Sequence, residues 1–263
     1  MSIVALTSSR STALVSLSDV KLWLGISEED TSEDALLRSL IAVASSAIVG
    51  YLKFPLARQR YEETRKGNGK TEIWLSRLPI EPESLTIELD GEEITDWTLE
   101  SAEYGRVVRT CGWPSSTEAN LTFTYHAGYV LPDEIADWSA TTSKAAWARS
   151  SSPSLFLFEC TTAGTTGASE PSWPDETGAT VVDGSVAWTA RDAAELPLEV
   201  SIAAYAVVLD RRIRSLAPAG VTSIELSEGE RVSFSANAGH GHLPPNVLGW
   251  ADTFGAGKQA VAA

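Results

Sequence analysis

Leu196-Pro-Leu-Glu-Val200 opens the stretch of sequence that decides the fold. Proline suits the first position of a helix, and apolar residues then recur at helical spacing as far as Leu216. Nearly the same opening stands earlier, as Leu131-Pro-Asp-Glu-Ile135, and it too predicts the start of a helix. There, however, the helical spacing of apolar residues ends, and Ser, Thr, Ala and Gly follow. We therefore predict that residues 138–193 are an insertion placed ahead of a helix spanning residues 197–217.

Two more helices are predicted near the N-terminus. The first spans residues 16–25, where Ser16 and an acid three residues later have the spacing of a capping box. The second spans residues 32–54, with an acidic first turn that begins at Thr31 and a stop at Pro55. Its apolar residues lie on more than one side, which is typical of a helix that packs both within a subunit and against neighbours.

Residues 59–126 change to short β-rich stretches separated by turn signals such as Asp90-Gly91, and we predict an antiparallel β-meander. The predicted fold class is therefore α+β: a helical bundle of three helices, a β-meander and the inserted module. One core domain would comprise residues 14–137 and 194–250.

The insertion has the character of a small all-β module, with strand-like runs and Gly- and Pro-containing turns. Its tryptophans include Trp147, Trp173 and Trp188. Exposed on its surface, these rings would form a stacking platform for sugars. In so small a module, aromatic side chains more often supply the core.

Composition narrows the function classes. The 263 residues carry a net charge of −15, which argues against an outer surface that neutralises DNA phosphates. A negative wall is still compatible with DNA that passes through a pore without sticking. No apolar run approaches the ~18 residues of a membrane span, and we expect no secretory signal. Cys111 and Cys160 are expected to be reduced and structural.

Two motifs resemble parts of a nucleotide-binding site and a metal site, but their spacing or their predicted secondary structure does not match such sites. Gly69-Lys70-Thr71 resembles part of a P-loop, but it leads into a strand instead of a helix, so a hairpin turn is predicted. His240-Gly-His242 would supply two metal ligands, and the remaining histidine, His126, lies far away in a predicted strand. The acidic clusters fall in turns and caps. We predict no enzyme activity, no catalytic residues, no metal and no cofactor.

Two features remain near the C-terminus. Arg211, Arg212 and Arg214 lie late on the predicted long helix, where positive charge favours the helix dipole. The same cluster would also serve as a contact to an acidic neighbouring subunit or to DNA. Residues 251–263 are predicted to form a flexible tail.

The order of these features resembles a known family. The N-terminal helices end in Tyr51-Leu-Lys-Phe-Pro55, the β-rich part closes with Tyr125-His-Ala-Gly-Tyr129, and a late Val221-Thr-Ser stretch follows the long helix. This ordered set resembles the gp6-like head–tail connector (adaptor) proteins of tailed phages and gene transfer agents. The insertion is a departure from the compact members. It resembles a small β module that recurs in phage structural proteins.

The resemblance implies a function in assembly. Family members form an oligomeric ring of about a dozen copies (a dodecameric ring) under the portal vertex, extend the DNA channel and dock a stopper or tail-completion protein. The partners expected are therefore further copies of the chain, the portal protein, the next neck component and packaged DNA bound without sequence specificity. The chain is expected in the virion neck after synthesis in the host cytoplasm. The residues expected to contact the portal or neck partner are Leu243, Val247, Leu248, Trp250 and Phe254.

Two alternative functions remain open from the sequence. The first is a phage surface protein that uses its Trp-rich insertion to bind glycans. The second is an enzyme of unrecognised type, for which the sequence offers no convergent set of polar residues.

Overall fold

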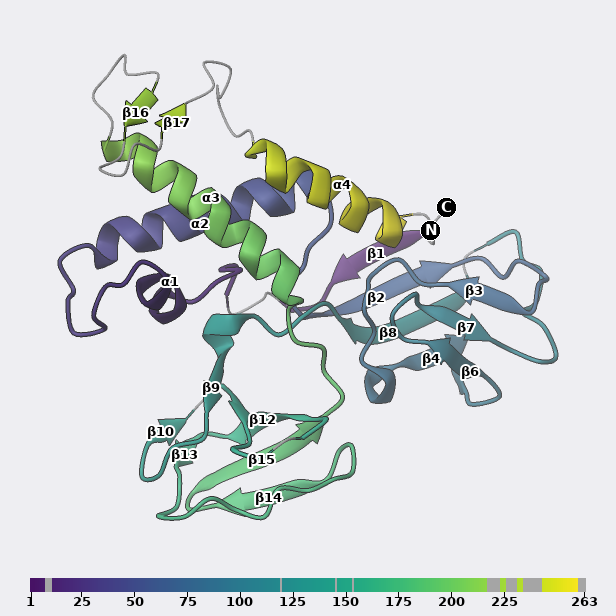
Figure 1. Ribbon diagram of the computed structural model, residues 1–263. Helices are drawn as coiled ribbons and strands as arrows, with labels where there is room; N and C mark the ends of the chain where they lie inside the picture. The colour runs from purple at the N-terminus through teal and green to yellow at the C-terminus, as the bar shows by residue number, and fades with distance from the viewer. Residues whose placement is uncertain are drawn as a thin grey trace. The chain divides into compact units, whose positions relative to one another are not determined.

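The computed structural model describes residues 1–7, 11–118, 120–144, 146–152, 154–216, 223–225, 231–233 and 243–259. Within these residues it contains four α-helices and several β-sheets, mostly antiparallel, so the predicted α+β class is confirmed (Figure 1). The chain separates into two compact units. One comprises Met1–Ser11, Leu56–Leu196 and Lys258–Ala263; the other, the helical unit, comprises Thr12–Pro55 and Pro197–Gly257.

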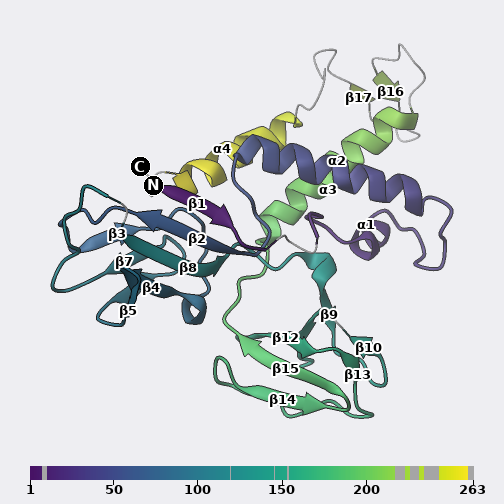
Figure 2. The same ribbon diagram turned by 180° about the vertical axis from the view of Figure 1, so that it is seen from behind.

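The helical unit is built on a crossing pair of long helices, which both views show (Figures 1 and 2). Ser16 caps the first short helix through its side-chain oxygen, which accepts from the backbone N–H of Asp19 at 3.0 Å, as the sequence predicts. Gly25, at φ +68°, follows the end of that helix. The helices and the small hairpin of this unit are α1 (Leu17–Trp23), α2 (Asp34–Leu52), α3 (Leu198–Leu216), β16 (Ser223–Glu225), β17 (Arg231–Ser233) and α4 (Pro245–Gln259).

Helix α2 differs from its prediction at both ends. It begins at Asp34, two residues after the predicted start at residue 32, and the side chain of the preceding Glu33 makes no cap hydrogen bond. It ends at Leu52 because Lys53 adopts a left-handed conformation, ahead of Pro55. By length and composition α2 is also the one helix among the described residues that is able to cross a membrane, although a third of it is buried inside the protein.

The flexible tail predicted from residue 251 onward is wrong for residues 251–259, because α4 continues through them. The helix holds few strong helix formers, and its stability comes from packing: Val247 and Ala251 are almost fully buried. Periodicity alone did not reveal it, because glycine and other small residues interrupt the pattern.

The predicted β-meander is antiparallel, but its strands do not follow the order of the chain. The larger sheet has the order β1-β2-β8-β4-β5, with the late strand β8 between β2 and β4, and the smaller sheet has the order β3-β7-β6 (Figure 2). The strands are β1 (Ser2–Ala5), β2 (Gln59–Arg65), β3 (Glu72–Trp74), β4 (Thr86–Leu89), β5 (Glu92–Ile94), β6 (Thr98–Ser101), β7 (Arg106–Val108) and β8 (Leu121–Ala127); η1 (Pro82–Ser84) is a 3-10 turn.

Strand β8 is the centre of this part of the fold. Its side chains alternate strictly between buried and half-buried, and its buried residues include Phe123 and Tyr125. Trp113 packs against Phe123, with ring centroids 5.9 Å apart, and closes the core between the two sheets. The N-terminal strand β1, which the sequence analysis missed, pairs along β2 from Ser2 to Ala5.

The insertion forms its own sheet, in the order β14-β15-β12-β11-β9. The helix expected to start at Leu131 is one 3-10 turn, η2 (Pro132–Glu134), followed by β9, which pairs in parallel with β11. That prediction is wrong because Ile135 and its neighbours bond to a strand of the module. The strands are β9 (Ile135–Asp137), β10 (Ser143–Lys144), β11 (Trp147–Arg149), β12 (Leu157–Thr162), β13 (Gly164–Thr165), β14 (Thr180–Asp183) and β15 (Val186–Arg191).

Candidate functional site

The residues predicted to contact a portal or neck partner lie on and just before α4, and the structure divides them. Leu243 and Val247 are buried within the chain at 4% and 2% exposure, and their contact with a partner stays a prediction. Leu248 and Trp250 are half-buried. Phe254 stacks on Trp250, with ring centroids 5.2 Å apart.

Helix α4 is held to the C-terminal end of α2. The Phe54 and Phe254 ring centroids are 6.4 Å apart, and the Tyr51 hydroxyl donates to the Asp252 carboxylate. That hydrogen bond raises the pKa of Tyr51. The predicted partner segment is therefore a packed helix of the helical unit.

The arginine cluster of α3 is partly engaged within the chain. Arg212 pairs with Glu33 at 2.7 Å from Nη2 to Oε2. Arg211 is half-buried, and the side chain of Arg214 lies outside the described residues. A role of these arginines toward a neighbouring subunit or DNA stays a prediction.

The tryptophans of the insertion form its core. Trp188 is fully buried, and Trp147 is 5% exposed. Trp173 is half-buried against Phe158, with ring centroids 4.1 Å apart, and its Nε1 donates to Glu170 at 2.6 Å. Because Trp147 and Trp188 are buried, these three rings do not form an exposed platform for sugars in this structure.

The P-loop-like and histidine motifs of the sequence were predicted to carry no chemistry, and the structure describes the first of them. Gly69 has φ +70°, and Thr71 is followed directly by β3, as the turn interpretation predicts. His240 and His242 lie outside the described residues. Among the residues that are described, no group of three or more His, Cys, Asp or Glu side chains has the arrangement of a metal site. Cys111 and Cys160 are both free thiols.

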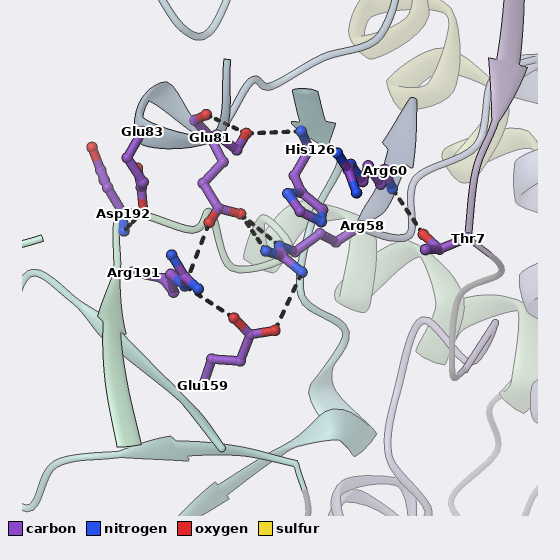
Figure 3. A network of polar contacts seen from close by, with 10 residues as sticks. Thr7, Arg58, Arg60, Glu81, Glu83, His126, Glu159, Arg191 and Asp192 are labelled. Carbon is purple, nitrogen blue, oxygen red and sulfur yellow. Dashed lines mark hydrogen bonds and ion pairs between the residues drawn. The ribbon is translucent and has the colours of Figure 1, made fainter. Parts of the chain in front are cut away.

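A charged junction joins the larger sheet to the inserted module, and the sequence analysis missed it (Figure 3). Arg58 and Glu81 come from loops beside β2 and η1, whereas Glu159 and Arg191 come from β12 and β15 of the module. Each side thus contributes one cation and one anion. We call these four residues the junction network.

The geometry of the junction network alternates in sign. Glu81 Oε2 accepts from both Nε and Nη2 of Arg58, at 2.6 Å each. Arg191 Nε lies 2.9 Å from Glu159 Oε2 and 3.9 Å from Glu81 Oε1, and Arg58 Nη1 lies 3.8 Å from Glu159 Oε1. Each charge therefore has opposite charges on both sides of the junction (Figure 3).

Two charged side chains of the junction network are largely buried. The side chain of Glu81 is 4% exposed and that of Arg58 is 13% exposed. The Arg58 guanidinium also lies over the Trp147 ring, 4.9 Å from its centroid, so one module aromatic covers the central cation. Charges held at this depth interact strongly, and removing one partner leaves the other uncompensated.

Two titratable neighbours border the junction network. Burial, followed by the Arg58 charge, lowers the pKa of His126 on β8. Burial, followed by repulsion from Glu81 and Asp192, raises the pKa of Glu83, although the Glu83 carboxylate accepts from the Asp192 backbone N–H at 3.1 Å.

The chain also enters and leaves the module at one place. The backbone N–H of Val130 donates to Ala194 at 2.8 Å, and that of Leu196 donates back to Val130 at 3.3 Å. The two ends of the inserted segment are thus neighbours, as expected for a module set into a continuous core.

The comparison with family models agrees with the predicted resemblance. Residues 13–139 match the head completion protein family. None of the curated proteins matches the chain. Among solved structures, the chain is similar to a protein from the neck of an empty gene transfer agent particle, with 17% identity and a TM-score of 0.35 over 49% of this chain and 72% of that chain. A chain from the virion of a native gene transfer agent particle gives the same identity and TM-score over 49% and 73%.

The family match covers the N-terminal helices and the strands as far as the start of the module. It ends where the inserted module begins, so the module is additional to the matched segment. The match covers just under half of the chain and agrees with the resemblance, stated from the sequence, to head–tail connector-type structural proteins of the phage virion.

Proposed function

We propose that this chain is a ring subunit of the phage neck, seated under the portal, where the ring extends the DNA channel and docks the next neck or tail component. The observation that carries the proposal is the match of residues 13–139 to the head completion protein family. The negative net charge supports it, because a wall of the same sign as DNA lets the duplex pass without binding.

The inserted module would decorate the ring as a fixed projection. Its attachment by the junction network supports a set orientation, because two pairs of charges and a cation–π contact act at one place. A flexibly tethered module would need none of these contacts. In the assembled ring the modules would act as spacers or as surfaces for a further virion protein.

Electron microscopy of the chain mixed with its portal protein tests the proposal. The expected result is a closed ring of copies coaxial with the portal channel, with the modules as a regular outer or lower layer. Val182→Asp is a suitable control variant, because Val182 is 72% exposed on an edge strand of the module, and it should leave the ring unchanged. A strict monomer that never joins the portal would refute the proposal.

A further inference from the structure

The loop between β2 and β3 carries two lysines that its own surroundings do not neutralise. Lys66 and Lys70 are both exposed, and they stand on either side of Gly67-Asn68-Gly69. The nearest acids along the chain, Glu63 and Glu72, are already paired with arginines. Neither lysine enters an ion pair with any residue that the structure describes. The two ammonium groups are therefore available to a partner.

A second loop, residues 112–118, packs directly on this one. A Cβ added to Gly67 would lie 1.7 Å from the Pro114 carbonyl oxygen, so the two backbones touch at this point. The backbone N–H of Ser116 also donates to the Gly67 carbonyl at 3.1 Å, which holds one loop on the other. Five exposed residues of the two loops, which we call the lysine tip, are Lys66, Asn68, Lys70, Ser115 and Thr117.

The backbone of the lysine tip is held by hydrogen bonds within the chain. Asn68 Oδ1 accepts from the backbone N–H of Lys70 at 2.9 Å, and Asn68 Nδ2 donates to the Glu72 carbonyl at 3.1 Å. Gly69, at φ +70°, lets the chain turn between these two bonds. Because the backbone is already ordered, a partner has to order only the lysine side chains.

The lysine tip is a locally positive place in a strongly acidic chain. Residues 53–77 hold seven Lys and Arg against three Asp and Glu, whereas the whole chain holds 20 against 35. Two exposed acids border the tip. One is Glu118 on the second loop; the other is Asp90, whose N–H donates to the carbonyl of Asn120, the residue whose side chain accepts from Gly67. A small cationic spot with an acidic rim suits a weak contact to a polyanion.

We propose that the lysine tip contacts the phosphate backbone of DNA that passes through the ring. The inference rests on the proposed ring function and names the surface that meets the DNA. Lysine ammonium groups, Ser and Thr hydroxyls and Asn amides are groups with which proteins contact phosphate oxygens, and the tip presents all of them. Contacts to phosphate carry no base information, so the tip treats every sequence alike. Two lysines per copy keep the contact weak and sensitive to salt, which lets the duplex slide.

The double variant Lys66→Gln/Lys70→Gln tests this contact. The control, Lys53→Gln/Lys144→Gln, removes the same two charges elsewhere in the chain. Rings of each variant are assembled on the portal protein, and the binding of a fluorescein-labelled duplex of roughly 20 bp is followed by anisotropy between about 20 and about 200 mM salt. The tip variant is expected to bind at least about fivefold more weakly at low salt, with a salt slope lower by up to about 1.8 for each contacting copy. The control is expected to bind like the parent, and ATP is not expected to compete, because one nucleotide lacks the condensed counterions of a duplex.

The outcomes separate this inference from the proposed function. Parent rings that bind no DNA, or an equal loss of affinity in the tip variant and the control, would overturn the contact and leave the ring function standing. Displacement of the duplex by ATP would also overturn it, because the tip would then be a site for free nucleotides. A tip variant that no longer joins the portal would show that the lysines face an acidic protein surface instead of DNA. A parent chain that forms no ring would remove the proposed function and the contact together.

Discussion

Replacing Glu81 by glutamine tests whether the junction network stabilises the protein. The carboxylate is 4% exposed and accepts two 2.6 Å hydrogen bonds from Arg58, which is itself 13% exposed. The variant keeps the shape of the side chain but leaves the Arg58 charge with Glu159 alone, 3.8 Å away. Breaking one partner of a buried charged pair costs about 3–5 kcal/mol, and the retained glutamine oxygen offsets part of this. We expect a loss of about 2–4 kcal/mol in the free energy of unfolding.

The measurement is urea unfolding followed by tryptophan fluorescence, supported by thermal unfolding. The expected loss corresponds to a decrease in Tm of roughly 4–16 °C for a domain of this size. Glu100→Gln is the matched control: Glu100 pairs with Arg106 at 2.6 Å, but both side chains are about 40% exposed, so its effect should stay within about 0.5 kcal/mol. A double-mutant cycle with Arg58→Gln isolates the coupling. Equal stability of Glu81→Gln and Glu100→Gln would refute the reasoning.

Three further predictions use the same unfolding assays. Tyr125→Phe removes a hydroxyl that donates to the fully buried Glu63 at 2.6 Å, and we expect a loss of about 1–3 kcal/mol; an unchanged midpoint would show that water replaces the hydroxyl. Burial, then Arg58, lowers the pKa of His126 from 6.5, so its contribution is fully present above about pH 6.5 and is lost as the pH falls through the folded-state pKa. His126→Asn should therefore flatten the stability profile on the acid side of pH 6.5, and an unaltered slope would contradict this. Trp173→Ala removes a ring stacked in the module core and should cost about 2–4 kcal/mol, seen as earlier unfolding of the module.

The helices were largely predictable because their signals are local. The cap at Ser16 and the 3.6-residue spacing of apolar side chains act within a few turns, so α1, α2 and α3 lie within two residues of their predicted ends. Helix α4 was not predictable in this way, because burial of Val247 and Ala251 against other elements overrides its weak propensity.

The sheet order and the junction network depend on long-range contacts that no short pattern reports. The antiparallel strands were readable from alternation and turn residues, but only the folded core places β8 between β2 and β4. The junction network brings together residues 58, 81, 159 and 191, and each of these alone looks like an ordinary surface charge. The tryptophans were identifiable as aromatic anchors, whereas their burial followed from the small size of the module.

The insertion point explains why such a module is tolerated in this fold. Val130 exchanges backbone hydrogen bonds with Ala194 and Leu196, so the core holds the two ends of the inserted segment next to each other. The inserted segment starts nearer to residue 131 than to the predicted residue 138, because Ile135–Asp137 pairs with the module as β9. Adjacent ends alone would let the module swing. The junction network lies beside those ends, since the Arg58 backbone N–H donates to the Tyr129 carbonyl at 2.8 Å, and its ion pairs add side-chain contacts that restrain the module there.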